Sequence, residues 1–223
     1  MNKVVAVVLN YNTAKDSKKC LEYLLKQDYA DFEIVVVDNN SPMNDYQKLE
    51  SDIDTLQSNR IELIRNEINS GFSAGNNIGL RRAKEKDAEW SLVINPDVEL
   101  RDKSYITKMI SAISETHKVA VAASNVILPN GQRQNPMIEP KYWEELLWPI
   151  ESVTRKIRKN NSYLGADQTG YCEKVSGCCF FIRMSFAEKM GYLDESVFLY
   201  CEEPILASRV KKYGYKELYG REI

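Results

Sequence analysis

Residues 4–12 read VVAVVLNYN, six apolar residues that run directly into a polar turn. A continuous apolar run of this length is typical of a strand buried on both faces of a parallel sheet. Residues 32–42, FEIVVVDNNSP, repeat the arrangement, and an apolar stripe at residues 20–25 predicts a helix between the two runs. The order strand, helix, strand indicates an α/β fold.

The same alternation continues along the chain. Residues 61–65 and 90–94 predict two further strands, and Ser73 would cap a helix between them that runs to residue 86. The whole pattern predicts a doubly wound, mainly parallel sheet flanked by helices. Beyond residue 100 we expect strands at 119–123, 173–182 and 215–219, and helices at 105–114, 185–190 and 204–213.

The size and charge of the chain narrow the class of protein. With 223 residues it is long enough to bury a substantial core, and we expect one domain over 1–223. The 30 Lys and Arg residues nearly balance the 32 Asp and Glu residues, giving a formal net charge of −2. Since non-specific nucleic-acid binding needs a strong basic excess, we expect no nucleic-acid partner.

The cysteines and the N-terminus indicate the compartment. There are five Cys without a CxxC pair, and His117 is the only His, so a zinc site is not expected. The first apolar run is too short for a signal peptide or a membrane span. We therefore expect reduced, buried cysteines in a soluble cytoplasmic protein.

Polar clusters follow the predicted strands, at the edge where parallel sheets bind ligands. Asp38 could accept hydrogen bonds from a ribose or a base, or could end its strand in an Asx turn. Residues 69–79, NSGFSAGNNIG, let a ligand approach the backbone, yet match neither the dinucleotide nor the P-loop pattern. The alternative is an ordinary glycine-rich start of a helix.

Two acidic clusters could carry chemistry. Asp97 follows the strand at 90–94 and could hold a divalent cation that bridges phosphates. Glu202 and Glu203 are adjacent, and repulsion between them could give one of the two the pKa of a general base. The alternative is a solvated acidic start of a helix.

Taken together and in this order, these blocks resemble the family 2 glycosyltransferases of the GT-A fold, particularly the rhamnosyltransferase-like branch. The blocks are VVAVVLNYN, IVVVDNNS, NSGFSAGNNIGL, LVINPDVEL, VSGCCFFIR and GYLDESVFLYCEEPILASRVKKYGYK, and they cover residues 3–219. The resemblance implies a nucleotide-sugar-binding half over 1–100 and an acceptor-side half over 101–223. Family members usually continue beyond the point where this sequence stops, so we expect a shortened chain.

The resemblance implies an inverting transfer from dTDP-rhamnose or a UDP-hexose to a hydroxyl of a polysaccharide or lipid-linked glycan. Asp97 maps onto the carboxylate that binds Mn²⁺ or Mg²⁺. Glu203 maps onto the general base, but the family's Glu-Asp is Glu-Glu here, so Glu202 is the alternative base. The positions implied for the nucleotide sugar are Asn10, Tyr11, Asp38, Asn40, Asn69, Gly71, Asn76, Asn77 and Asn95.

Other functions remain open at this stage. A non-catalytic or degenerate nucleotide-sugar-binding module would share the fold and the donor loop. A sugar-phosphate nucleotidyltransferase is disfavoured, because residues 10–16 contain no glycine. Trp143 and Trp148, followed by basic residues at 155–159, could seat the protein at the inner face of a membrane, or could belong to a helix packed on its own domain. The oligomeric state is not predicted.

Overall fold

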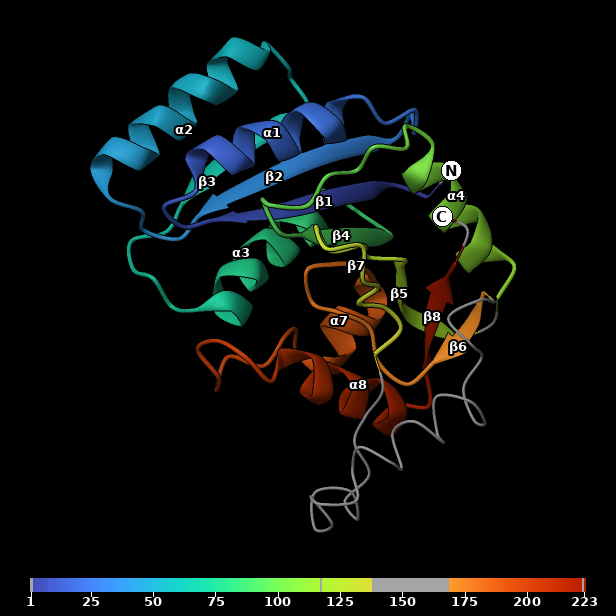
Figure 1. Cartoon of the computed structure of the whole chain (residues 1–223). Helices are drawn as coiled ribbons and strands as arrows, with labels where there is room; N and C mark the ends of the chain where they lie inside the picture. The colour runs from blue at the N-terminus through green and yellow to red at the C-terminus, as the bar shows by residue number, and fades with distance from the viewer. Residues whose placement is uncertain (1, 117, 138–168, 222) are drawn as a thin grey trace.

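The computed structural model describes residues 2–116, 118–137, 169–221 and 223 (Figure 1). The expectations for His117, Trp143, Trp148 and residues 155–159 lie outside these residues. An eight-stranded sheet runs through the molecule in the order β3-β2-β1-β4-β7-β5-β8-β6.

The first half of the sheet is parallel, as the sequence predicts. It consists of β1 (Val4–Asn10), β2 (Phe32–Asp38), β3 (Ile61–Arg65) and β4 (Trp90–Ile94). Strand β1 lies between β2 and β4, and β3 lies outside β2. The carboxyl ends of these strands therefore meet at one edge of the sheet, where a doubly wound fold binds its ligands.

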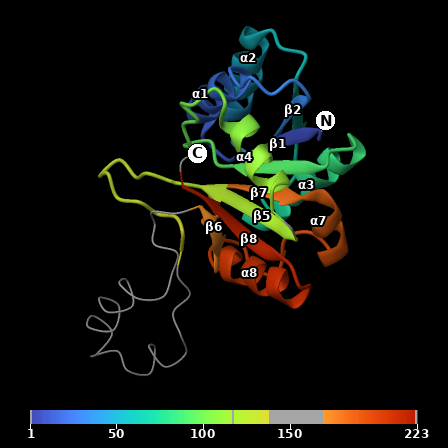
Figure 2. The same cartoon turned by 90° about the vertical axis from the view of Figure 1, so that its right-hand side faces the viewer.

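The second half of the sheet is mixed (Figure 2). Strand β7 (Cys179–Arg183) lies antiparallel between β4 and β5 (Val119–Ser124). Strand β8 (Lys216–Gly220) pairs parallel with β5 and antiparallel with the short β6 (Gly170–Cys172). Because β7 runs against β4, its first residue lies beside the last residue of β4, at the same edge as the ends of β1 and β2.

Helices cover both faces of the sheet and close an apolar core on each (Figure 1). The alternating residues of β1 supply both cores, Val4 and Ala6 to one and Val5 and Val7 to the other. One face is covered by α1 (Ala14–Leu25), α2 (Met43–Leu56) and α4 (Tyr105–Ser114). The other is covered by α3 (Phe72–Glu85), α7 (Met184–Met190) and α8 (Glu202–Lys212).

The structure corrects three expectations. Helix α2 was not predicted from the sequence. The strand expected at 173–182 is confirmed only in its second half, because residues 173–178 form a loop that leads to the edge of the sheet. Ser73 is not the N-cap of α3: Gly71 occupies that position, and the Ser73 hydroxyl makes no capping bond.

The cysteines are free thiols, as expected, but they are not all buried. Cys20 and Cys179 are buried, Cys172 and Cys178 are partly exposed, and Cys201 is exposed. Among the described residues, no helix is both long enough and apolar enough to cross a membrane.

Candidate active site

Parallel pairing brings the polar ends of the first three strands side by side. Asn10 is the register partner of Asp38, and Asp38 is the partner of Arg65. Phe72, at the start of α3, donates its backbone N–H to the carbonyl of Phe198, 2.8 Å away. The segment that leads into α8 therefore lies against the start of α3, at this same edge.

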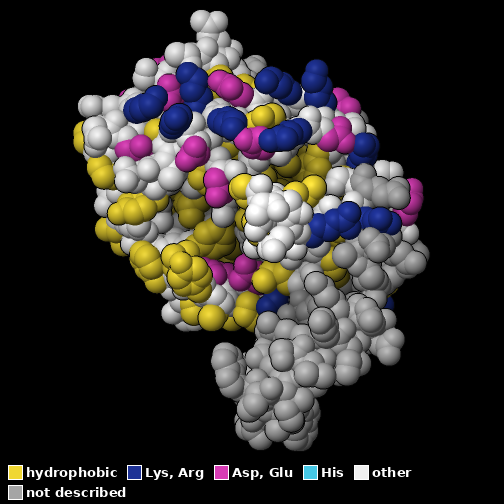
Figure 3. Space-filling model, viewed as in Figure 1, with side chains coloured by type: hydrophobic (Ala, Val, Ile, Leu, Met, Phe, Trp, Pro, Cys, Tyr) yellow, Lys and Arg dark blue, Asp and Glu magenta, His cyan; other side chains and the backbone are white. Residues whose placement is uncertain are grey.

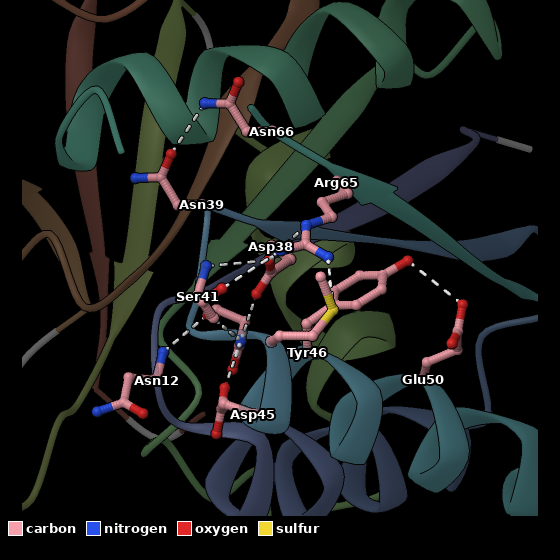
Figure 4. A network of polar contacts seen from close by, with 11 residues as sticks. Asn12, Asp38, Asn39, Ser41, Asp45, Tyr46, Glu50, Arg65 and Asn66 are labelled. Atoms are coloured by element: carbon pink, nitrogen blue, oxygen red, sulfur yellow. Dashed lines mark hydrogen bonds and ion pairs between the residues drawn. The ribbon is translucent and has the colours of Figure 1, made fainter. Parts of the chain in front are cut away.

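Asn10 is the centre of a buried polar network. Figure 4 shows Asp38, Ser41 and Asp45, three residues of this network. Asn10 Nδ2 donates to Asp38 Oδ1 at 2.8 Å and to Ser41 Oγ at 3.0 Å, and its Oδ1 accepts from Ser17 Oγ at 2.7 Å. Asp38 Oδ2 accepts the backbone N–H of Ser41 at 3.1 Å. The network fixes the turns after β1 and β2.

The structure brings Asn10 and Asp38 together but leaves neither side chain at the surface, since both are 0% exposed. Their hydrogen bonds position the loops. Of the residues predicted here for the nucleoside, Tyr11, 51% exposed, and Asn40, also exposed, have side chains that a ligand could contact.

Arg65 closes one side of this region and was not singled out from the sequence. Its guanidinium lies 4.1 Å from the centre of the Tyr46 ring, and its Nη2 donates to the carbonyl of Ser41 at 3.4 Å (Figure 4). Its Nε lies 3.9 Å from Asp38 Oδ2. The sequence did contain a signal for Arg65, because it is a basic residue at the end of a predicted strand, as Asp38 is an acidic one.

The Asn-rich loop before α3 is held by a second network. Asn39 Nδ2 donates to Asn69 Oδ1 at 2.8 Å, and Asn66 Nδ2 donates to Asn39 Oδ1 at 3.0 Å. Gly71 has a φ of 92°, and an added Cβ would lie 2.4 Å from the Phe198 carbonyl oxygen. Glycine is therefore required at this contact for two separate reasons.

Asn76 and Asn77 are buried and face the protein. Asn76 Nδ2 donates to the carbonyl of Phe72 at 3.0 Å, one turn earlier in α3. Asn77 binds the backbone of Leu193 in both directions at 2.9 Å, and its Nδ2 also donates to Glu195 Oε1 at 2.8 Å. The two side chains belong to the framework around the loop, and Asn77 ties α3 to the segment before α8.

Asp97 stands open beside the end of β4. Asn95 donates its backbone N–H to the carbonyl of Cys178 at 2.8 Å, so the turn with Asp97 is fixed against the start of β7. Asp97 is exposed. Glu99, two residues on, is instead engaged by Lys19 and Arg101, whose hydrogen bonds lower the pKa of Glu99 to about 2.

The Cys178 thiol lies within electrostatic reach of both Asp97 and Glu203. Burial raises the pKa of Cys178, and the carboxylates of Asp97 and Glu203 raise it further, against a hydrogen bond from Ser176 that lowers it. Figure 3 shows acidic side chains in a hollow on this face, next to the start of α8. Cys178 was not identified from the sequence as a site residue, because two adjacent Cys in an apolar strand predict buried core side chains.

The two adjacent glutamates of α8 have different surroundings. Glu203 Oε1 accepts the backbone N–H of Gly177 at 3.2 Å, beside Cys178. Glu202 instead lines a small cavity with Ser73, Leu206 and Arg209. Glu203 is therefore the glutamate that contacts the loop before β7, and that loop also holds the turn with Asp97 through the bond from Asn95 to Cys178.

Asp97 is the exposed carboxylate in this region that could bind a divalent cation. Across the described part of the chain, no group of three or more His, Cys, Asp or Glu side chains is arranged to hold a metal. Mg²⁺ commonly takes one or two carboxylates and completes its shell with substrate phosphates and water. Asp97 fits that mode of binding, and no all-protein cage is seen among these residues.

A comparison with known protein families settles the family of this chain. The profile described as "Glycosyl transferase family 2" matches residues 5–191. The chain belongs to glycosyl transferase family 2. The match runs from β1 through α7, so it includes the ends of β1, β2 and β4 and the loop before α3 described above.

Two curated relatives show how far this similarity extends. The low-salt glycan biosynthesis hexosyltransferase Agl10 of Haloferax volcanii is 27% identical over 207 residues, which are 92% of this chain and 61% of that protein. The N-acetylglucosaminyl-diphospho-decaprenol L-rhamnosyltransferase of Mycobacterium tuberculosis is 27% identical over 59% of this chain and 44% of its own length. The chain therefore spans less than two thirds of either relative.

Solved structures confirm the GT-A fold. The mannosyltransferase PcManGT of Pyrobaculum calidifontis, in complex with GDP-Man and Mn²⁺, aligns with a TM-score of 0.69 at 17% identity, covering 99% of this chain and 55% of its own. TarS 1–349 of S. aureus aligns with a TM-score of 0.67 at 18% identity, covering 98% of this chain and 58% of its own.

Proposed function

We propose that this protein is an inverting glycosyltransferase that moves a sugar from a nucleotide-diphosphate donor to a hydroxyl of a glycan or lipid-linked acceptor. The observation that carries the proposal is that the turn with Asp97 and the Glu203 side chain are both fixed to residues 177–178, through the hydrogen bonds Asn95 N–H to Cys178 O and Gly177 N–H to Glu203 Oε1, at the ligand-binding edge of the sheet. The names of the hexosyltransferase and rhamnosyltransferase relatives support a hexose or rhamnose as the transferred sugar, and we propose dTDP-rhamnose or a UDP-hexose as the donor.

Inversion requires a base that deprotonates the acceptor hydroxyl and a leaving group that is stable once it departs. The Glu203 carboxylate takes the proton of the acceptor hydroxyl as its oxygen attacks the anomeric carbon. The new bond to carbon forms as the bond to the diphosphate oxygen breaks, and the nucleoside diphosphate leaves with that electron pair. Asp97 would hold a divalent cation, Mn²⁺ or Mg²⁺, which supplies a Lewis acid for the negative charge on the diphosphate.

The other residues bind and orient the donor. Tyr11 and Asn40 are exposed at the turns that Asn10 and Asp38 fix, and we assign them to the nucleoside. We assign Asn69, in the loop before α3, and Asn95, in the turn after β4 that carries Asp97, to the diphosphate sugar.

The first test is donor binding, measured as a thermal shift with UDP, dTDP or GDP in the presence and absence of Mn²⁺. We expect one nucleotide to raise the Tm only with Mn²⁺, and Asp97→Ala to abolish the shift. Glu99→Ala is the matched control, because Glu99 is occupied by Lys19 and Arg101 and should not affect binding. A shift that survives in Asp97→Ala would remove Asp97 as the metal ligand.

The second test is turnover of the donor that binds. Glu203→Gln should lower kcat by about 10²–10⁴-fold, the usual contribution of a general base, without a loss of donor affinity. Glu202→Gln is the control and should remain within about threefold of the wild type, because Glu202 lines the cavity beside Ser73 and Arg209, and Gln keeps its size and one of its oxygens. Nucleotide binding without turnover in the wild type would favour the alternative, a non-catalytic nucleotide-sugar-binding module.

A further inference from the structure

Two buried oxygen atoms on different helices lack a hydrogen-bond partner among the residues that the structure describes. They are Ser73 Oγ, in the first turn of α3, and Glu202 Oε1, at the first residue of α8. Ser73 is only 1% exposed. Both residues line one small cavity, and Asp194 and Arg209, which are ion-paired with each other, line it too.

The cavity has the size that a single water molecule needs, and four polar side chains, Ser73, Asp194, Glu202 and Arg209, line it beside four aliphatic ones. Its volume is about 10 Å³, close to the smallest space that accommodates one water, and a buried water needs two to four polar partners. A buried oxygen without a partner is costly, and more so in a carboxylate. One bound water would satisfy both oxygens at once.

The cavity lies in the contact between α3 and the segment that leads into α8. Phe72 binds the carbonyl of Phe198, and Asn77 binds Leu193, so two hydrogen-bonded ties flank Ser73 along α3. Helix α3 continues from the loop proposed to bind the donor, and α8 carries the proposed base. A bridge at Ser73 therefore connects the donor side of the site with Glu203.

We propose that a buried water bridges Ser73 Oγ and Glu202 Oε1, and that Glu202 is a positioning residue that fixes the first turn of α8 and thereby Glu203. The part of this inference that concerns Glu203 rests on the proposed function. The water bridge itself stands on the two unpaired oxygens and the cavity, so the two can fail separately.

A crystal structure of the protein at high resolution tests the bridge directly. We expect an ordered water within hydrogen-bond distance of both oxygens, and a dry cavity would overturn the proposal. A double-mutant cycle on the Tm gives a second measurement, with Ser73→Ala, Glu202→Met and the double variant. The double variant should lose clearly less than the sum of the two single losses, because either change removes the same water. Additive losses would show that the two residues do not share a partner.

Steady-state kinetics test the positioning. Glu202→Met should lower kcat by about 10- to 100-fold, as expected for a displaced catalytic group, with the donor KM and the pH profile unchanged. Glu202→Gln keeps an oxygen for the water and should restore most of the rate. A loss confined to KM would overturn the positioning role, and a Glu202→Gln variant as slow as Glu203→Gln would make Glu202 the base.

The positioning can also be measured without any donor. Hydrogen exchange of residues 198–203 should be faster in Glu202→Met than in the wild type, because the first turn of α8 loses its tie to α3. Unchanged exchange in that segment would overturn the proposal, whether or not the protein transfers a sugar. If the water is present and exchange is faster in Glu202→Met, but the wild type turns over no donor, the result would count against the proposed function alone.

Discussion

Gly71 occupies the most restrictive single position of the site. Its φ of 92° disfavours any side chain, and an added Cβ would lie 2.4 Å from the Phe198 carbonyl oxygen, which also accepts the N–H of Phe72. We expect Gly71→Ala to lower the free energy of unfolding by about 2–4 kcal/mol, from backbone strain together with the weakened hydrogen bond. Urea unfolding followed by circular dichroism measures this.

The matched control is Gly191→Ala. Gly191 has a φ of 79° at the end of α7, but nothing lies within 4 Å of its added Cβ. That substitution carries the backbone strain alone, about 1 kcal/mol. Equal losses in the two variants would mean that the segment at Phe198 moves away freely, and that α3 does not constrain the approach to α8.

The choice between Glu202 and Glu203 shows where residue-level inference from sequence ends. Both were predicted as site candidates from an acidic pair next to a helix. Neighbouring positions on a helix differ by about 100° in direction, so only one of them can face the site. Which one faces it depends on how α8 packs against the loop at Gly177 and on α3, and these contacts join residues far apart in the chain.

At the scale of elements, the buried amide of Asn77 joins α3 to the backbone of Leu193, in the segment before α8. Asn77 satisfies both backbone groups of Leu193, and Asn77→Ala leaves them without their partner. We expect a loss of about 2–3 kcal/mol in the free energy of unfolding. Asn76→Ala is the control: Asn76 is equally buried, but among the described residues its amide binds only within α3 and its Oδ1 has no partner. A loss of more than about 1 kcal/mol in the control would contradict this division of roles.

The helices and strands were predicted best where an apolar pattern was continuous. Strands β1, β2 and β4 are buried throughout apart from Leu9 and Glu33, and the sequence predicted each of them. Helix α2 was missed because its inner face is narrow: Leu49 and Asp52 are its buried residues. Ile53 and Leu56 continue that face at helical spacing, and Pro42 precedes the helix, so a weak signal was present.

At the scale of the whole molecule, the sequence predicted the parallel half of the sheet more completely than the mixed half. Consecutive β-α-β units restrict the order of their strands, because right-handed crossovers place each strand beside an earlier one. Nothing local places β7 antiparallel between β4 and β5, since that pairing joins segments about 60 to 90 residues apart in sequence. Yet this insertion is what brings Gly177 and Cys178 beside Asp97 and Glu203.

The pKa values of the carboxyl groups predict how the stability of the whole molecule depends on pH. In the described part of the chain, seven carboxyl groups have a pKa that departs clearly from the ordinary value, and in all seven it is lowered. These groups are Glu33, Asp52, Glu62, Glu99, Asp102, Asp194 and Glu195. Hydrogen bonds from Lys19 to Glu99 and from Lys108 to Asp102 lower each of those two pKa values to about 2. A carboxyl group whose pKa is lower in the folded state stabilises the protein above its unfolded pKa, and that contribution disappears as the pH falls through the folded pKa.

We therefore expect the Tm to be nearly constant from neutral pH down to about pH 5 and to fall steadily from about pH 4.5 toward pH 2. Calorimetric scans across this range at low ionic strength measure the decline. In about 1 M salt the decline should be shallower, because most of these ion pairs are at the surface and are screened. A Tm that rises on acidification below about pH 4 would contradict the direction of these pKa shifts. A decline that does not respond to salt would mean that hydrogen bonds to buried groups stabilise the carboxylates, and that the surface ion pairs of Lys19, Arg101 and Lys108 do not.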